Sequence, residues 1–388
     1  MRILIVLTYY RPHTSGLTIY AERLAKAFAK RGHIVTVLTS RYDRDLPLEE
    51  MDEGVRIVRA PVLMRVSKGV IMPTFGMITN RLVLEHDVLQ LHLPQFDAAG
   101  VSLRGRLLRK PTVVTYHCDL RMPPGLLSLA ANAAIHFMNT LAAVFTHRIV
   151  TYTQDYADHS PYAKRYLNKL RVILPPVILP EVSEEAVKLF SEKANPESRH
   201  PVIGMAARFA TEKGVEVLLN AMKDILKVYP NAIVQFAGPY EDIIGEEQYF
   251  KRLEPTIRQY EASGNWKFLG VLDPAQMVGF YRNIDTLVMS SLNSTEAFGL
   301  VQIEAMLNGA PSVAANLPGV RQPVKMHGMG EVFLIGDSSA LAKSVIKVLE
   351  NPEAYQNDPD EIAQHYNPDR IAQEYEKLFE EISKELHG

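Results

Sequence analysis

Short apolar segments rich in β-branched residues alternate with longer segments of helical periodicity, and the alternation begins a second time after residue 200. Parallel strands need crossover connections of a dozen or more residues, and these are usually helices. The pattern therefore predicts α/β architecture, with parallel sheets covered by helices on both faces. The second start predicts two such domains, which agrees with a length of 388 residues.

The expected elements follow from this periodicity. In the first half we expect strands at 2–7, 33–39, 55–59, 88–92, 112–117, 147–151 and 171–174, and helices at 17–31, 96–108 and 126–145. In the second half we expect strands at 201–207, 232–237, 266–269, 286–290, 312–315 and 332–335, and helices at 215–228, 275–281 and 300–308.

A proline-rich segment at 174–180 separates the halves, with three prolines in seven residues. Proline resists both helix and central strand because it lacks an N–H group and fixes φ. We expect an N-terminal domain over 1–180 and a C-terminal domain over 181–367. Residues 368–388 are predicted to form a helix, with apolar side chains at helical spacing: Ile371, Tyr375, Leu378, Phe379, Ile382 and Leu386.

The charged residues are unevenly distributed. Residues 1–180 hold 23 Lys and Arg against 13 Asp and Glu, and the remainder holds 19 against 31. Two interpretations stay open: the halves meet different partners, or they balance each other. The basic residues lack interleaved aromatic residues in a recognisable motif, so no nucleic-acid partner is expected.

The single cysteine, Cys118, excludes an intramolecular disulfide and fits a reducing compartment. The apolar segment 1–8 is short and lacks a small-residue cleavage site. It is expected to be the first strand rather than a signal peptide. We therefore expect a cytoplasmic protein.

Residues 126–145 contain no Asp, Glu, Lys or Arg, over a length that suffices to span a bilayer. Polar residues interrupt this segment: Ser128, Asn132, His136, Asn139 and Thr140. A helix within the domain is preferred, and a helix at a membrane interface or a membrane span are the alternatives. A basic cluster precedes the segment: Arg104, Arg106, Arg109, Lys110 and Arg121. Such clusters attract anionic head groups, so peripheral contact with the inner face of the cell membrane is a further expectation.

The most informative segment for function contains Glu296 and Glu304, with seven residues between them that read as a loop entering a helix at Gly299. A helix start presents unpaired N–H groups and the positive end of the helix dipole, which suits a phosphate. Ionised carboxylates accept strong hydrogen bonds and suit sugar hydroxyls. The segment therefore has the groups to hold a sugar, a phosphate and a ribose.

A second candidate segment follows the first strand of the second half. Arg208 and Lys213 frame the loop 207–214, which precedes a helix. Two cations at a strand end can neutralise a diphosphate leaving group. In open α/β sheets ligands bind at the carboxyl ends of the strands, where both segments are expected.

With these motifs the sequence resembles the large retaining glycosyltransferase family 4, and the resemblance covers nearly the whole chain. The E-x7-E signature of the family matches Glu296 and Glu304, and its Arg and Lys pair matches Arg208 and Lys213. The resemblance implies a GT-B fold, in which two Rossmann-like doubly wound domains face each other across a cleft. It also implies that the C-terminal helix packs back on the first domain.

The resemblance extends to the first half. The family's first-loop glycine matches Gly16, where Ser15 replaces a further glycine, and its N-domain histidine matches His117. Asp119, close to His117, is a candidate contact for the acceptor. The implied donor-binding residues are Gly16, Arg208, Lys213, Gly238, Phe298, Gly299, Leu300 and Glu304, and the implied catalytic residues are His117, Glu296, Arg208 and Lys213.

The roles implied by the resemblance are specific. Glu304 would hold the ribose hydroxyls, Glu296 the transferred sugar, and the two cations the diphosphate. Backbone N–H groups at 298–300 would add to the anion site, and His117 would lie near the anomeric carbon. Gly238 and the segment 266–270 would lie near the base.

The implied activity is transfer of a sugar from a nucleoside-diphosphate sugar to a hydroxyl acceptor, with retention at the anomeric carbon and no metal or other cofactor. The basic first half and the apolar segment 126–145 favour a lipid-linked or cell-envelope glycan precursor as acceptor, with a soluble acceptor as the alternative. An epimerase or hydrolase of the same fold and a non-catalytic nucleotide-sugar-binding module stay open. A dinucleotide oxidoreductase is not expected, because no G-x-G-x-x-G follows the first strand.

Overall fold

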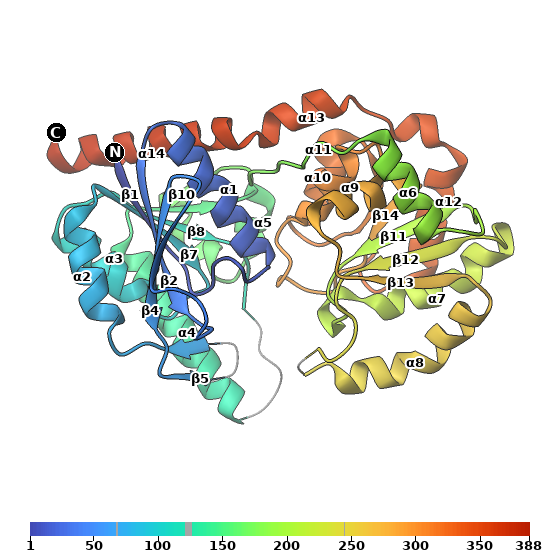
Figure 1. Cartoon of the computed structure of the whole chain (residues 1–388), viewed down its shortest axis with the longest axis horizontal. Coiled ribbons are helices and arrows are strands. Elements are labelled where there is room, and N and C mark those ends of the chain that lie inside the picture. Colours follow the sequence, from blue (N-terminus) through green and yellow to red (C-terminus); the bar gives the residue numbers. More distant parts are fainter. Residues whose placement is uncertain (67–68, 121–125, 244) are drawn as a thin grey trace. The chain divides into compact units, whose positions relative to one another are not determined.

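The computed structural model describes residues 1–66, 69–120, 126–243 and 245–388, with the side chains of 66 and 126–131 outside that description. The chain divides into two compact units (Figure 1). Unit 1 comprises Met1–Val177 and Tyr366–Gly388, and unit 2 comprises Ile178–His365. The predicted boundaries, at residues 180 and 367, fall close to these limits, and residues 173–183 form neither helix nor strand.

Unit 1 contains an eight-stranded sheet with the order β10-β9-β8-β7-β1-β2-β4-β3. Its strands are β1 (Arg2–Val6), β2 (Ile34–Arg41), β3 (Glu49–Asp52), β4 (Val55–Pro61), β7 (Val88–Leu93), β8 (Thr112–Tyr116), β9 (Arg148–Thr151) and β10 (Leu170–Val172). Neighbouring strands are parallel except for β3 and β4. Strands β5 (Met64–Val66) and β6 (Gly69–Ile71) pair separately. Strand β7 is buried along its whole length, as expected for a strand covered on both faces.

The helices of unit 1 are α1 (Gly16–Lys30), α2 (Phe75–Glu85), α3 (Ala98–Leu107), α4 (Leu126–Phe145), α5 (Gln154–His159), the 3₁₀ segment η1 (Ala163–Lys169) and α14 (Pro368–His387). Helices α2, α3 and α4 pack in series, and α1 packs against α14. Figure 1 shows α14 running alongside unit 1.

Helix α14 belongs to unit 1 because its apolar stripe is buried there, as Ile371, Leu378 and Ile382 show. The Tyr375 hydroxyl lies 2.7 Å from both the Tyr20 hydroxyl and Thr115 Oγ1. Acidic side chains of the helix pair with basic residues of the unit, including Glu376 with Arg31 at 2.6 Å and Glu381 with Arg171 at 2.7 Å. The helix thus reduces the excess of positive charge on unit 1.

Unit 2 contains a six-stranded parallel sheet with the order β13-β12-β11-β14-β15-β16. Its strands are β11 (Val202–Ala206), β12 (Ile233–Ala237), β13 (Trp266–Gly270), β14 (Thr286–Met289), β15 (Ser312–Ala315) and β16 (Gly330–Phe333). Counted along the chain this is the order 3-2-1-4-5-6 of a Rossmann sheet. The run β4-β2-β1-β7-β8-β9 repeats that order in unit 1. The predicted pair of doubly wound α/β domains is confirmed.

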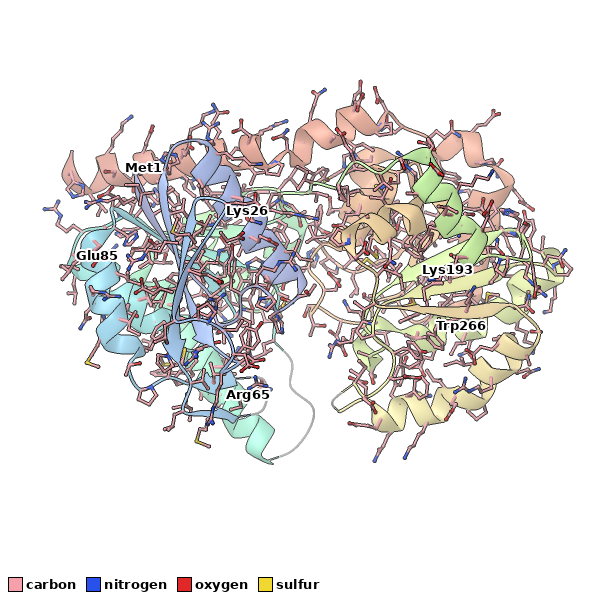
Figure 2. The ribbon with its side chains drawn as sticks, viewed as in Figure 1. Met1, Lys26, Arg65, Glu85, Lys193 and Trp266 are labelled. Carbon is pink, nitrogen blue, oxygen red and sulfur yellow. The ribbon has the colours of Figure 1, made fainter. Side chains whose placement is uncertain are left out.

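The helical segments of unit 2 are α6 (Glu184–Ala194), η2 (Thr211–Lys213), α7 (Val215–Val228), α8 (Glu247–Ala262), α9 (Pro274–Asn283), α10 (Leu300–Met306), α11 (Gln322–His327), α12 (Ser338–Glu350), η3 (Pro352–Tyr355) and α13 (Pro359–Tyr366), whose last residue belongs to unit 1. Helix α7 packs between α8 and α12, and α9 packs between α6 and α10. The chain's single tryptophan, Trp266, lies buried in β13 (Figure 2).

Several elements lie outside the set predicted from the sequence. Strand β3, Glu-Glu-Met-Asp, has none of the β-branched residues that mark a strand and is held by backbone pairing with β4. Helix α8 is rich in charge and contains Pro255, which weakens the helical signal. Tertiary packing overrides local preference at such places.

Helix α4 spans the predicted residues. Ala142 and Ala143 are buried, whereas Phe137 is 62% exposed and Val144 is 49% exposed. Among the residues described, no helix is both long enough and apolar enough to cross a membrane.

The basic cluster before α4 has structural contacts of its own. Arg104 donates to the Gly100 carbonyl at 2.7 Å, and Lys110 donates to the Val83 and Leu84 carbonyls at 2.5 and 3.1 Å. Arg121 lies outside the described residues. Lys110 therefore stabilises the C-terminal end of α2, where carbonyl groups lack partners, and Arg104 contacts the first turn of α3.

Candidate functional site

The loops after β11 and β14 meet at the carboxyl edge of the unit 2 sheet, because these two strands are neighbours. Ser290, just after β14, donates its hydroxyl to the carbonyls of Lys213 and Gly214 at 3.0 and 2.9 Å. Lys213 Nζ then donates to Glu296 Oε2 at 2.6 Å. The structure therefore brings together two predicted site residues that are 83 positions apart in the sequence.

The Lys213–Glu296 ion pair is partly buried, with 23% and 19% of the two side chains exposed. Burial lowers the pKa of Lys213, but the charge of Glu296 and its hydrogen bond outweigh burial, so the pKa lies above its ordinary value. Lys213 is therefore a permanent cation at neutral pH. Arg208 pairs with Glu212 and contributes a second positive charge close to Lys213.

Two glycines let the backbone close around these loops. Gly214 has φ +66°, and a Cβ there would lie 2.2 Å from the Ser290 carbonyl oxygen. Gly238 has φ +134°, and a Cβ there would lie 2.1 Å from the Ala207 carbonyl oxygen. Packing of the chain on itself thus explains Gly238, and its role near the base stays a prediction. Gly214 was not singled out from the sequence, although it directly follows Lys213 at a helix entry.

The predicted helix entry at Gly299 is confirmed. Gly299 has φ +83°, caps α10, and has no room for a side chain, because a Cβ would lie 2.4 Å from Met289 Sδ. Phe298 before it is buried, and Leu300 is the first residue of α10. Fully buried Gln302 holds this entry by donating to the Phe298 carbonyl at 2.9 Å.

Gln302 is a positioning residue that the sequence reasoning missed. Its side-chain amide also donates to the Val320 carbonyl at 2.9 Å and accepts from Ser312 Oγ at 3.1 Å. The sequence did offer one signal for it: Gln302 is an amide side chain between the apolar residues Val301 and Ile303, where a buried polar group needs hydrogen-bond partners.

Glu304 lies in α10 and is partly exposed. The Tyr281 hydroxyl, from α9, donates to Glu304 Oε2 at 2.9 Å. This contact orients a carboxylate that can accept hydrogen bonds from vicinal hydroxyls, as a ribose would present. The ribose role itself stays a prediction.

His117 follows β8 in unit 1 and is almost fully buried. Its Nε2 lies 2.8 Å from His92 Nδ1, and its Nδ1 makes a short contact with the Tyr152 hydroxyl. The ring of Tyr20 meets His117 edge-on, with the centroids 4.9 Å apart. His92, Tyr152 and Tyr20 were not identified from the sequence, because they reach His117 from β7, from the end of β9 and from α1.

The histidine pair is uncharged at neutral pH. Burial lowers the pKa of His92 to about 3, and burial together with His92 lowers the pKa of His117 well below its ordinary value. His117 is therefore a hydrogen-bonding group without a permanent charge. Both of its ring nitrogens have partners in unit 1, so a ligand hydroxyl that bonds to the ring replaces one of them.

Gly16 is the first residue of α1, and Ser15 caps that helix by accepting from the Thr18 N–H at 3.2 Å. Gly16 does not adopt a left-handed backbone, and no atom lies within 4 Å of a Cβ built there. The chain itself thus gives no reason for a glycine at this position. The space beside Gly16 is open, and its predicted role beside phosphates stays a prediction.

In the described part of the chain, no three or more His, Cys, Asp or Glu residues are placed together to hold a metal ion. Arg208, Lys213 and Glu296 come together in unit 2, and Glu304 and the Gly299 turn lie on α10 of the same unit. Gly16 and His117 belong to unit 1.

Two Rossmann-type sheets, each with candidate ligand groups at its carboxyl edge, define a protein of GT-B fold. The model described as "Glycosyltransferase Family 4" matches residues 14–179, and the model described as "Glycosyl transferases group 1" matches residues 187–366. Together they account for most of both units. The chain belongs to the group 1 glycosyltransferases of family 4.

Similar proteins agree with this assignment. The chain is 25% identical to the uncharacterised glycosyltransferase MJ1607 of Methanocaldococcus jannaschii, over 100% of both proteins. It is 23% identical to a phosphatidyl-myo-inositol mannosyltransferase of Mycobacterium leprae, over 99% of this chain and 97% of that protein. The solved structure of Anabaena Alr3699/HepE in complex with UDP-glucose superposes with a TM-score of 0.70, at 18% identity, over 100% of this chain and 99% of that one.

Proposed function

We propose that this glycosyltransferase moves a sugar from a nucleoside-diphosphate sugar to a hydroxyl acceptor, with retention at the anomeric carbon and without a metal ion. The observation that carries the proposal is the direct contact of Lys213 with Glu296, beside Arg208, at the carboxyl edge of the unit 2 sheet. The similarity to a protein solved with UDP-glucose adds support for this class of donor.

The geometry suits departure of a diphosphate. Lys213 and Arg208 are fixed cations that stabilise negative charge on the leaving oxygen, so no acid is needed to protonate it. Glu296, held by Lys213, accepts hydrogen bonds from the hydroxyls of the transferred sugar. In a same-face substitution the anomeric bond to phosphate breaks, the bond to the acceptor oxygen forms, and the acceptor proton passes to the departing phosphate.

The proposed acceptor is a lipid-linked glycan precursor. Helices α2, α3 and α4 pack in series and expose large apolar side chains: Met77, Leu84, Leu103, Leu107, Phe137 and Val144. Exposed Arg106 and Arg109 of the basic cluster lie beside Leu107. Apolar and basic groups together favour contact with an anionic membrane. The M. leprae relative is named a phosphatidyl-myo-inositol mannosyltransferase, and phosphatidyl-myo-inositol is a phospholipid. This name adds support for a lipid-linked acceptor. A soluble acceptor is the alternative.

The first experiment measures thermal stabilisation of the full chain by UDP-, GDP-, ADP- and dTDP-sugars, with and without EDTA. A donor at 100 times its Kd should stabilise the protein by about 2.7 kcal/mol. Turnover with that donor, followed by the configuration of the new anomeric centre by NMR, tests retention. Stabilisation by a donor without turnover argues for a non-catalytic nucleotide-sugar-binding module, and no stabilisation by any donor, in folded protein, contradicts the proposed donor class.

The other open activities have distinct products. An epimerase or hydrolase of this fold releases its product without any acceptor, whereas the proposed transferase forms a new glycoside only when a hydroxyl acceptor is present. Loss of stabilisation on addition of EDTA would contradict metal independence. Equal binding to anionic and neutral vesicles at low salt would contradict the membrane part of the proposal.

A further inference from the structure

Helix α4 carries a polar stripe that the proposed chemistry leaves unused. The helix has no charged residue, yet Asn132, His136 and Thr140 recur every four residues. This spacing places them on one face of the helix. All three line a cavity of about 530 Å³ within unit 1.

The remaining lining of this cavity comes from two loops of the same unit. Asp119 and Leu120 follow β8, and Pro161, Tyr162 and Arg165 come from the segment between α5 and the end of η1. The cavity therefore lies beyond the carboxyl end of a parallel strand, where doubly wound sheets bind ligands. Its volume falls in the range of about 300–1,000 Å³ typical of small-molecule sites.

Asp119 is the key group, with only 6% of the residue exposed. Its Oδ1 accepts from the Tyr116 hydroxyl at 2.8 Å and from Ser160 Oγ at 2.7 Å. Its Oδ2 has no hydrogen-bond partner among the described residues, and neither does Oδ1 of Asn132. Burying a polar atom without a partner is costly, so two such acceptors on residues that line one cavity need an explanation.

Hydroxyl donors supplied by a ligand are the explanation that fits the lining. A phosphate or carboxylate would meet the negative charge of Asp119, whereas a sugar hydroxyl can donate to Asp119 and to Asn132. Arg165, which is exposed, can donate to a ring or hydroxyl oxygen. Tyr162 adds an apolar ring surface to this polar lining.

We propose that this cavity binds a neutral hydroxylated sugar ring, with Asp119 as the principal hydrogen-bond acceptor. That this sugar belongs to the glycosyl acceptor rests on the proposed function; the binding itself does not. The ring can come from a soluble saccharide or from the head group of a glycolipid, since both present the same hydroxyls.

The test uses the full chain without any nucleotide sugar. Binding of methyl glycosides of glucose, mannose, galactose and N-acetylglucosamine is measured by saturation-transfer NMR and titration, and vesicles of a neutral glycolipid form the second arm. Asp119→Asn keeps an oxygen for Tyr116 and Ser160 but turns the other position into a donor. We expect binding to weaken about tenfold or more, because a hydrogen bond to a charged group is lost.

Asp158→Asn, at an exposed position on α5, is the matched control and should bind as wild type. Weaker binding of Asp119→Asn in the glycoside arm or the vesicle arm supports the site and identifies the source of the ring. Absence of binding by the wild type in both arms, or unchanged binding by a folded Asp119→Asn protein, overturns it.

A second variant covers loss of folding. If Asp119→Asn has a much lower melting temperature than the wild type, Arg165→Met is used instead, because replacing this exposed side chain should not disturb folding. Weaker sugar binding by Arg165→Met supports the site, and unchanged binding overturns it. Donor stabilisation is measured separately, so failure of sugar binding here leaves the proposed transferase activity intact, and failure of turnover leaves this site intact.

Discussion

Units 1 and 2 share a strand order but place different chemistry at the carboxyl edges of their sheets. Unit 2 holds a partly buried ion pair between Lys213 and Glu296. Unit 1 holds a buried, uncharged pair of His92 and His117. With α14 included, unit 1 has 26 Lys and Arg against 19 Asp and Glu, and unit 2 has 16 against 25. The same strand order therefore carries a charged site in unit 2 and an uncharged site in unit 1, because the loops after the strands supply the side chains.

The two sites also depend on different kinds of support. In unit 2 the contacts come from loops of the same sheet, tied by Ser290 and Gln302. In unit 1 the tyrosine beside His117, Tyr20, hydrogen-bonds with Tyr375 of α14, a segment 355 residues further along the chain. Unit 1 is thus the one whose stability depends on a distant piece of sequence.

The largest expected effect tests this dependence. Phe379→Ala removes a fully buried ring of α14 that packs near Phe28 and Tyr375, and should lower the free energy of unfolding of unit 1 by about 3–5 kcal/mol. Urea unfolding followed by circular dichroism should show the loss. Fluorescence of Trp266, which lies in unit 2 (Figure 2), should change little.

Leu386→Ala, at a partly exposed position of the same helix, is the control for Phe379→Ala and should cost much less. If circular dichroism and Trp266 fluorescence show the same loss of stability, the two units unfold together, and the dependence on α14 is not specific to unit 1.

The second prediction concerns the charged site of unit 2. Lys213→Met should lower kcat about 10²–10³-fold, because a fixed cation beside the leaving diphosphate is lost. Lys223→Met, at an exposed position on α7, is the matched control and should keep full activity. Radiolabelled sugar transfer measures both. Near-normal transfer by a folded Lys213→Met protein would remove Lys213 from the mechanism.

The third prediction separates the units by pH. The unfolded chain protonates its histidines near pH 6.5, whereas folded unit 1 keeps His92 neutral down to a pKa of about 3 and His147 to about 4. Stability is therefore complete above about pH 6.5 and is lost as pH falls below it. His92 alone should cost about 2 kcal/mol at pH 5.

Unit 2 has fewer such groups: its lowered histidine pKa is that of His327, at about 4. Between pH 7 and pH 5, the free energy of unfolding of unit 1 should therefore fall more than that of unit 2. Denaturant unfolding at each pH measures both, with Trp266 fluorescence as the reporter of unit 2. His92→Gln should reduce the difference. This prediction would be contradicted if acidification lowered the stability that Trp266 reports, that of unit 2, more than the stability of unit 1.

The smallest expected effect compares two glycines with the same predicted role. Gly299→Ala should destabilise unit 2 by about 1–3 kcal/mol, because its backbone is left-handed and Met289 fills the space. Gly16→Ala should be neutral or slightly stabilising in unit 1, since nothing surrounds that position. Melting temperatures measure both. Lower transfer by a stable Gly16→Ala protein would support a phosphate beside it, and full transfer would remove that role.

Much of the fold could be predicted from the sequence because its signals are local. The boundaries of α4 and α7 and the helix entry at Gly299 follow from periodicity and from turn chemistry. Strand β3 could not be predicted, because backbone pairing alone forms it. The candidate site residues were predicted from recognised motifs, but their neighbours Gln302, His92 and Tyr375 were not. His92 and Tyr375 come from other elements, and the role of Gln302 depends on its contacts with Val320 and Ser312.

The sequence by itself determined two doubly wound α/β domains, the starts of α4, α7 and α10, and the apolar stripe of the last helix, because residues near in sequence decide these properties. The tertiary structure alone decided that Lys213 contacts Glu296 and that His92 lies beside His117. These contacts depend on which strands become neighbours. Strand order follows from the packing of the whole sheet, and periodicity along the chain does not encode it.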